Sequence, residues 1–580
     1  MSGETMLIGV SLPQRLRSLT HAPNHRLLIA ITLAVCIIGL TMSAAIRRGM
    51  DHAVMIGQGD QTAIAIALSD SVYNVRLGYV GLKQVFDTIQ SYWHRDANLW
   101  ANYEQLKKNF HDAELLNAGI RAAASLGSQT AGYLHDGSLI TTYYDDIGEV
   151  DYVSLAFRLF GLKIQSMFYL YFTLLALSAL IFVLTFHDRI FALCLLATTL
   201  FAFYVELYLS FFEPIAISTY WGMRHSSTLC LVPMMHFAFL LLWRKKLSPA
   251  VAAGTVVQLA ILILTWRVRG SVAWVLVFLS ALAFWLALWD SWPRSGKLGL
   301  GWWAAVRDGV LTLPRSAVAV VRSWRLLVRR TLAWPLVVVL LGVLANNVYN
   351  RATLHPIYHL DDVMPHHGIW HSVHLGIGKY IPDVLTPRVF NVLQTQGFTE
   401  ELTLWGVRDY LDRAHFIPWN GKHEHLPLAP GYLSPWHGVG LKINWQERLL
   451  RYMYWDRAKA HPLRFLEFYA SMPSEVIRTL ASPFTQAPTL TWLWLVIAAG
   501  GAVFAILLGL ARSEAMDDGF KVLGVSAAAI TTATLPNLIS GYIASYSMSD
   551  SILMVMAFMA AAIGIGVYAV LRIWPRRRRA

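Results

Sequence analysis

The chain has 580 residues, of which 56% are hydrophobic and only 14% are charged, and its mean hydropathy is +0.46. A soluble protein of this length does not carry so apolar a composition, so that class is excluded and a membrane must be part of the solvent. The formal net charge of +13 does not indicate nucleic-acid binding, because Lys and Arg gather beside the ends of apolar runs.

Ten apolar runs approach or exceed the roughly 20 residues that a helix needs to cross a hydrocarbon core of about 30 Å. They predict a mainly α-helical, polytopic membrane protein with about ten transmembrane helices and two outer-face domains. The predicted spans cover residues 27–46, 164–186, 189–211, 228–243, 251–266, 271–289, 334–348, 490–510, 522–542 and 552–573.

The cations orient these spans, because Lys and Arg in short loops are retained in the cytoplasm. This rule predicts a multi-pass protein of a bacterial inner membrane with both termini cytoplasmic. The clusters that set the orientation are Arg15, Arg17, Arg26, Arg244, Lys245, Lys246 and the run 576–579. Arg267 and Arg269 then fall on the outer side, and the alternative is that the fifth and sixth runs form a re-entrant pair.

The same topology divides the chain into seven segments. Two of them are large and lie outside the membrane, where the second contains predicted helices at 399–413 and 446–458. In chain order the segments are a cytoplasmic N-terminus with the first span (1–46), an outer helical cap ending in an acidic interfacial helix (47–161), a transmembrane core (162–289), a cytoplasmic basic amphipathic segment (290–333), a further span (334–349), an outer His/Trp-rich domain (350–485), and three spans with a basic cytoplasmic tail (486–580).

The cap ends in an acidic segment that contains Asp145, Asp146, Glu149 and Asp151. Apolar residues at 153, 156, 157 and 160 follow as one stripe, which predicts an interfacial helix lying on the bilayer and stopped by Gly161. Carboxylates near a helix N-terminus are favoured by its dipole, and these are candidates for a general base or for ligands of Mg or Mn. The alternative is a capped helix start with solvated charges.

Two further groups of residues are candidates for catalysis or ligand binding. Asp60, just after the first span, stands where a catalytic carboxylate is also expected. Histidines and aspartates crowd residues 355–374, and Asp145 and Asp146 with His366 and His367 are a candidate metal site. The alternative is that the histidines, His371 and His374 among them, bind phosphate or sugar, or simply pack.

The membrane segments supply a last set of candidates. Glu206 lies inside a predicted span, where a carboxylate is costly and usually faces a cavity or a partner. Arg224 and His225 follow near an outward-facing turn and are candidates for binding a phosphate. The alternative for Glu206 is a buried pair that only holds helices together.

The acidic segment 145–151, the interfacial stripe ending in Phe160 and Gly161, the many-helix core and the later outer domain resemble the GT-C class of membrane glycosyltransferases. Residues 370–378 (WHSVHLGIG) also look like a loop of uncharacterised members. The class places its acidic residue directly after the first helix, whereas here more than a hundred residues intervene. Either Asp60 is that carboxylate or the first helix and its cap are an addition.

The resemblance implies a lipid-linked sugar donor, an unknown glycan, lipid or protein acceptor and a phospholipid bilayer as partners. In the class a carboxylate deprotonates the acceptor hydroxyl, sometimes with a metal, and cations stabilise the departing phosphate. Three rival functions stay open on sequence alone. They are a transporter or flippase, in which Glu206 couples the cycle, a non-catalytic envelope-assembly protein, and a metal-dependent hydrolase or phosphotransferase that uses the histidines.

Overall fold

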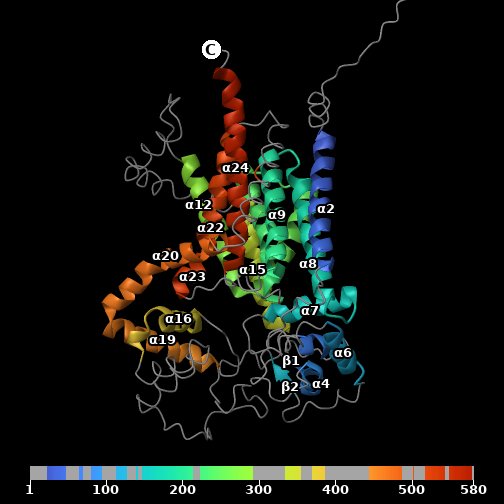
Figure 1. The fold of residues 1–580 in the computed structure, drawn as a ribbon, viewed down its shortest axis with the longest axis vertical. Helices are drawn as coiled ribbons and strands as arrows, with labels where there is room; N and C mark the ends of the chain where they lie inside the picture. The colour runs from blue at the N-terminus through green and yellow to red at the C-terminus, as the bar shows by residue number, and fades with distance from the viewer. Residues whose placement is uncertain are drawn as a thin grey trace, which may run out of the picture.

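The structure is a computed structural model in which thirteen stretches of the chain are described. These are residues 23–47, 64–69, 80–93, 113–126, 139–141, 147–212, 223–291, 333–353, 369–385, 443–485, 501, 516–541 and 548–577. The architecture is a bundle of long apolar helices with smaller elements at one end, which we call the cap end. The C-terminus lies at the opposite end (Figure 1).

Seven described helical segments are long and apolar enough to cross a membrane, as expected for a multi-pass membrane protein. They are Ser166–Phe186, Ser226–Trp243, Pro249–Val268, Gly270–Ala287, Trp334–Thr353, Asp517–Ser540 and Asp550–Tyr568. Each corresponds to a run predicted from the sequence. Two other predicted runs lie in α2 (Pro23–Arg47) and α9 (Ile190–Phe212), whose apolar segments are shorter, and the run 490–510 lies outside the described residues except for Gly501.

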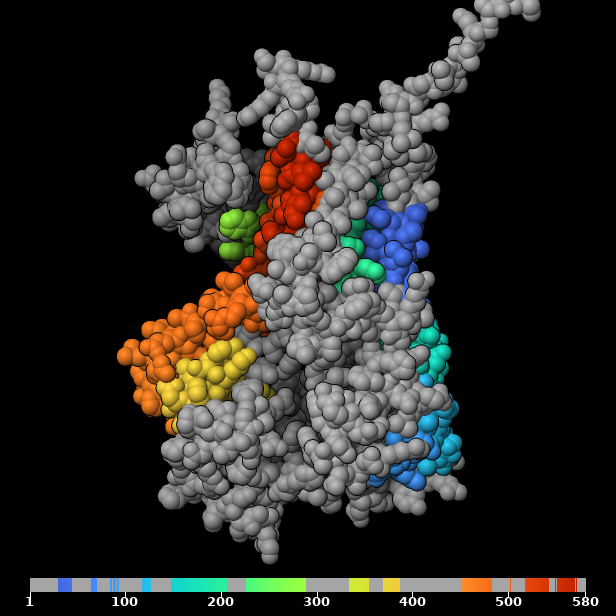
Figure 2. Space-filling view, viewed as in Figure 1, coloured from blue at the N-terminus to red at the C-terminus, as the bar shows by residue number. Residues whose placement is uncertain are grey.

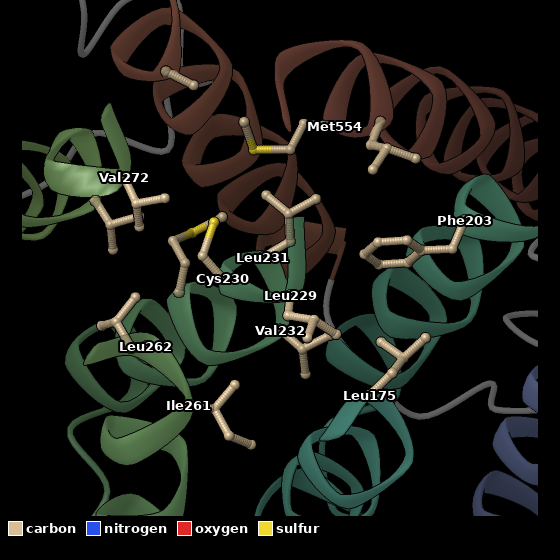
Figure 3. Close-up of a cluster of buried hydrophobic side chains, with 14 of the residues drawn as sticks. Leu175, Phe203, Leu229, Cys230, Leu231, Val232, Ile261, Leu262, Val272 and Met554 are labelled. Atoms are coloured by element: carbon tan, nitrogen blue, oxygen red, sulfur yellow. The ribbon is translucent and has the colours of Figure 1, made fainter. Parts of the chain in front are cut away.

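The bundle core forms where α8 (Ser166–Phe186), α9, α10 (Leu231–Trp243), α11 (Pro249–Val268) and α24 (Ser549–Arg577) meet. Figure 3 shows side chains from these helices converging on Cys230 and Leu231, with Met554 on one side and Leu262 on the other. The opposite faces expose large apolar side chains. Examples are Leu184 on α8, Val256 on α11 and Leu344 on α15 (Trp334–Thr353), which suit contact with lipid.

A reciprocal hydrogen-bonded pair fixes α8 against α11 inside the bundle. The Ser178 hydroxyl donates to Gln258 Oε1 at 2.6 Å, and Gln258 Nε2 donates back to the Ser178 carbonyl at 2.7 Å. A polar group in hydrocarbon needs an internal partner, and this pair supplies one for both residues. The register of α11 is thereby set, and with it the place of Arg267 at its cap end.

The first smaller unit is the cap, in which residues 64–69 are helical and fully buried. It also contains α4 (Lys83–Trp93), α6 (Ala113–Ala124) and one antiparallel pair of strands, β1 (Val80–Leu82) with β2 (Leu139–Thr141). The helices agree with the helical character predicted for this segment, and the outer-face domain itself stays a prediction. The strand pair was not predicted, because its segments of three residues are too short to show a period of two.

The second smaller unit contains α16 (Ile369–Tyr380), η5 (Pro382–Val384), α19 (Ile443–Ala460), α20 (Pro462–Thr485) and α23 (Leu535–Ser540). Gly376 of α16 lies against the backbone of Gly541, where an added Cβ would come within 2.6 Å of its carbonyl carbon and oxygen. The predicted helix at 446–458 is confirmed within α19, and the one at 399–413 lies outside the described residues.

The loop beside Arg267 and Arg269, the two cations that depart from the positive-inside pattern, joins two helical segments of full spanning length. α11 and the segment formed by η3 (Gly270–Ala273) and α12 (Trp274–Ser291) are both long enough to span, so the re-entrant alternative is not supported. The Arg269 N–H bonds the Thr265 carbonyl at 3.0 Å, which closes α11 just before the loop. The cations Arg267 and Arg269 therefore lie at the cap end of the bundle.

Candidate active site

The acidic segment enters helix α7 (Ile147–Phe160), which runs across the cap end of the bundle rather than along it (Figure 1). Gly161 ends it with a φ of +90°, a left-handed conformation that glycine adopts without a Cβ penalty, and its N–H bonds the Phe157 carbonyl at 3.0 Å. The predicted glycine stop is confirmed. The chain turns there from a surface helix into the span α8.

The apolar stripe of α7 faces protein instead of the bilayer, so the predicted lipid contact of this stripe is wrong. Val153 and Ala156 are 0% exposed and Phe157 is 3% exposed, and α7 contacts α8 and α11. These helices supply the apolar surface that the sequence pattern assigned to lipid. The outward side of α7 carries Leu155 and Leu159, of which Leu159 is 59% exposed.

Hydrogen bonds from the cap and from α7 lock the elbow between α7 and α8. Tyr152 Oη donates to the Met167 carbonyl at 2.7 Å, and burial raises the pKa of Tyr152, so that it stays a neutral donor. Asn117 of α6 accepts from the Ile164 N–H at 2.9 Å and donates to Gln165 Oε1 at 3.0 Å. The cap thus holds the helix that carries the carboxylates.

The N-terminal turn of α7 is pressed against the end of α11. A Cβ on Gly148 would collide with the backbone of Arg267 and Val268, so only glycine allows this approach. One residue further on, Glu149 is buried at 3% exposure. Of the predicted carboxylates, Glu149 therefore lies inside a packed junction and not on a solvated turn.

Arg267 ties three elements together at this junction. Its Nη2 lies 2.5 Å from Asp151 Oδ2 of α7, and its Nη1 donates to Asn346 Oδ1 of α15 at 3.4 Å. The guanidinium also stands 4.8 Å from the ring centre of Tyr349. Only 10% of the Arg267 side chain is exposed, so its charge is held mostly out of water beside the acidic helix.

The short helix η2 (Met223–Cys230) brings a second set of predicted residues to the same junction. It carries Arg224 and His225 and contacts α7, α8, α11 and α24. Its position is fixed at the buried end, where Thr228 Oγ1 and Tyr171 Oη of α8 are 2.9 Å apart. The backbone of the phosphate-binding candidates therefore belongs to an element that touches the acidic helix, and their side chains lie outside the described atoms.

Asp550 is a buried carboxylate that the sequence reading missed. It lies in the first turn of α24, is 6% exposed and accepts from Trp274 Nε1 at 3.4 Å through Oδ2. Within the described part of the chain its Oδ1 has no hydrogen-bond partner, and the charge of Arg269 acts on it. The only available signal was its place two residues before a predicted span.

The chain matches no known protein family, no curated protein and no solved structure.

Two of the predicted histidines, His371 and His374, lie in a different part of the molecule. Figure 1 shows α16, which carries His371 and His374, beside α19 and α20 and apart from α7. His374 is buried, and burial, together with the nearby Arg457 charge, lowers its pKa to about 4, so that it is neutral at physiological pH. The structure does not bring these histidines to the acidic helix.

Several predicted residues cannot be placed. Asp60, Asp145, Asp146, His366 and His367 lie outside the described residues, and Glu206 lies in α9 with its side chain also outside them. Among the residues that the structure does describe, no three His, Cys, Asp or Glu side chains come together in a way that could hold a metal ion. The metal site at Asp145, Asp146, His366 and His367 stays a prediction.

Proposed function

We propose that this chain is a membrane glycosyltransferase that moves a sugar from a polyprenyl-phosphate donor to a glycan, lipid or protein acceptor. In this proposal the cap end is the outer face of a bacterial inner membrane, and both termini are cytoplasmic. The sequence resemblance to the GT-C class supports the proposal, and so does the meeting of an acidic surface helix with cationic segments at one end of a helical bundle.

The observation that carries the proposal is the junction of α7, η2 and α11. Residues far apart in the chain put the carboxylates of α7 next to Arg267 and to the element that bears Arg224 and His225. A glycosyl transfer from a lipid phosphate needs a base for the acceptor and cations for the leaving phosphate. Both kinds of group are present at this junction.

The reaction needs no redox partner. A carboxylate takes the proton of the acceptor hydroxyl, the acceptor oxygen bonds to the anomeric carbon, and the bond from that carbon to the phosphate oxygen breaks. The electron pair leaves on the polyprenyl phosphate. Negative charge on the phosphate is greatest as that bond breaks, so preorganised cations in a water-poor site stabilise the transition state more than the bound donor.

We assign a role in the reaction to each residue by its place at the junction. Asp151 is engaged by Arg267 and positions α7. Asp146, with Asp145 and Glu149 as its neighbours, is the proposed base because it precedes the docked turn of α7. Arg224 and His225 are the proposed phosphate ligands. Divalent Mg or Mn stays a proposed cofactor of the acidic segment, without an assigned role in the step.

The test is donor binding to the purified protein, followed by native mass spectrometry with a polyprenyl-phosphate lipid. The wild type is compared with Arg224→Ala, with Asp146→Asn and with Arg478→Ala. Arg478 is the control because it is a cation on α20 whose side chain is 76% exposed. We expect binding to be lost in Arg224→Ala and kept in Asp146→Asn and in Arg478→Ala.

Two outcomes would count against the proposal. Binding no stronger than that of ordinary phospholipids would remove the donor site and favour the transporter or the assembly protein. Equal loss of binding in Arg224→Ala and Arg478→Ala would show that charge alone, and not a built phosphate site, attracts the lipid.

A further inference from the structure

Helix α20 leaves the bundle sideways near its cap end. It contacts α24, a membrane-spanning helix, and packs against α19 and α23. Figure 1 shows it reaching away from the spans, and the space-filling view leaves its upper edge uncovered beside the bundle (Figure 2). At 24 residues it is long enough to show clearly which sides it buries and which it exposes.

One side of α20 is buried in protein. Phe465, Phe468, Met472 and Val476 are each 5% exposed or less and recur at helical spacings of three and four residues. The ring of Phe468 lies 6.2 Å from that of Tyr380 on α16, and it also covers Gly541 after α23. This side is what attaches the helix to the second smaller unit.

A second side is apolar and exposed. Leu463, Leu466 and Ile477 are 72%, 68% and 66% exposed, and the exposed Ala470 and Pro473 fall between them. The positions 463, 466, 470, 473 and 477 follow alternating steps of three and four residues, so they form one continuous stripe along the helix. Large apolar side chains in such a stripe are not left in water without a partner.

The third side is polar. It carries Arg464, Glu467, Ser474 and Arg478, all exposed. Arg464 binds Asp383 of η5 at 2.9 Å and Glu467 at 2.7 Å, and Arg478 binds Glu475 at 2.9 Å. At 100° per residue the three sides lie about 120° apart around the helix. The helix is thus divided among protein, an apolar medium and water.

We infer that the exposed stripe of α20 rests in the phospholipid surface of the leaflet at the cap end. A helix lying at a bilayer surface is in contact with protein, acyl chains and water at once, which matches the three sides of α20. The bilayer reaches this position because α20 contacts the span α24 directly. The inference is independent of the proposed function.

The neighbouring α19 supports a lipid surface over a protein partner. Its exposed Tyr452 and Trp455 are the aromatic types that gather at membrane interfaces. Among its described side chains, Arg451, Arg457 and Lys459 outnumber Asp456, which suits anionic headgroups. α19 and α20 together then form an arm that holds the second smaller unit, with α16, on the membrane.

The test places a bimane fluorophore at single positions of α20 in a variant without its three native cysteines. Leu466→Cys and Ile477→Cys report on the stripe, and Glu467→Cys and Ser474→Cys are matched controls on the polar side. The labelled protein is reconstituted in nanodiscs of phosphatidylethanolamine and phosphatidylglycerol. Quenching is measured with brominated acyl chains and, separately, with aqueous acrylamide.

We expect brominated lipid to quench the stripe positions several-fold more than the controls, and acrylamide to do the reverse. The strongest effect is expected for bromines near the headgroup boundary, because such a helix sinks only about 5–10 Å. Equal acrylamide access at all four positions would overturn the inference. Protection of the stripe from both quenchers would also overturn it, because the stripe would then be covered by protein.

A second measurement does not depend on removing cysteines. p-Benzoylphenylalanine placed at Leu466 and, as the control, at Glu467 is irradiated in the same nanodiscs, and adduct masses are read by mass spectrometry. Lipid adducts at 466 that are absent at 467 support the inference. Adducts to a second copy of the chain at 466, without lipid adducts, contradict it.

Discussion

Gly148 is the residue at which the docking of α7 depends on a missing methyl group. In Gly148→Ala the new Cβ meets the backbone of Arg267 and Val268, which cannot yield without moving α11. We expect a loss of about 1–3 kcal/mol, typical of overpacking, seen as a lower midpoint of thermal unfolding in detergent. Gly524→Ala is the control, because nothing lies within 4 Å of a Cβ there. Equal midpoints in the two variants would mean that α7 does not dock as described.

His374 makes stability depend on pH. Its usual pKa of 6.5 applies to the unfolded chain, and burial lowers the folded value to about 4. Between these values the unfolded chain binds a proton that the folded chain does not, so stability falls as pH decreases. We expect His374 to account for a loss of about 2 kcal/mol between about pH 7 and about pH 5.

The measurement for His374 is the unfolding midpoint of wild type, His374→Gln and His371→Gln across that pH range. His374→Gln should show a shallower decline than wild type, and His371→Gln, a substitution of the same kind on the same helix, is the control. Parallel curves for all three proteins would show that His374 is protonated in the folded state and not buried as a neutral ring.

Some site residues could be predicted from the sequence because they belong to a pattern of neighbouring residues. Glu149 and Asp151 were predicted as members of a short acidic run before an apolar stripe, and both lie at the junction. Arg267 was visible only as an exception to the charge rule, since its partners Asp151 and Asn346 lie far away in the chain. Asp550 gave no such signal, because one carboxylate at a helix start is usually a capping residue.

At the scale of elements, the ion pair between Arg267 and Asp151 is the link from α11 to α7. Unfolding of Arg267→Ala, Asp151→Ala and the double variant forms a cycle that isolates this pair. We expect a coupling of about 0.5–3 kcal/mol, because Arg267 is mostly buried while a third of Asp151 is exposed. Additive losses would show that the two residues act separately. The matched cycle is Arg464 with Glu467, an exposed pair expected to couple by less than about 1 kcal/mol.

The faces of helices were harder to predict than their existence. The stripe of α7 was correctly identified as apolar, yet a period of 3.6 does not say whether protein or lipid will cover it. The helix α20 was not predicted, for a related reason. Phe465 is buried in protein, whereas its neighbour Leu466 is exposed. The apolar residues of α20 therefore lie on two sides of the helix and do not form a single stripe.

At the scale of the whole molecule, the proposed orientation can be tested with two exposed positions. Lys246 lies in the loop between α10 and α11, and His461 joins α19 to α20. We expect a membrane-impermeant maleimide to label His461→Cys in spheroplasts and to label Lys246→Cys only after the membrane is opened. Wild type is the blank, because its cysteines lie in apolar helices. Labelling of both positions on the same side would contradict the proposed topology.

The spans were the most predictable part of the molecule. Seven predicted runs coincide with long apolar helices, because a run of about 20 apolar residues has few other stable solutions. The placement of α16 against α23 was not predictable, since it depends on close backbone contacts such as that of Gly376 with Gly541. Such contacts leave no pattern in a single sequence.

Arg267 pairs with Asp151, whereas the charge of Arg269 acts on Asp550, so the two arginines depend on carboxylates that are synthesised at different times. In the proposed orientation, synthesis from the N-terminus brings Asp151 across the membrane before the loop that carries Arg267. The Asp151 carboxylate is therefore already present when Arg267 arrives. Asp550, on which Arg269 acts, is made last. The loop is therefore fixed early through Arg267 and only late through Arg269. We expect a chain truncated before α24 to insert into the membrane without reaching its native fold.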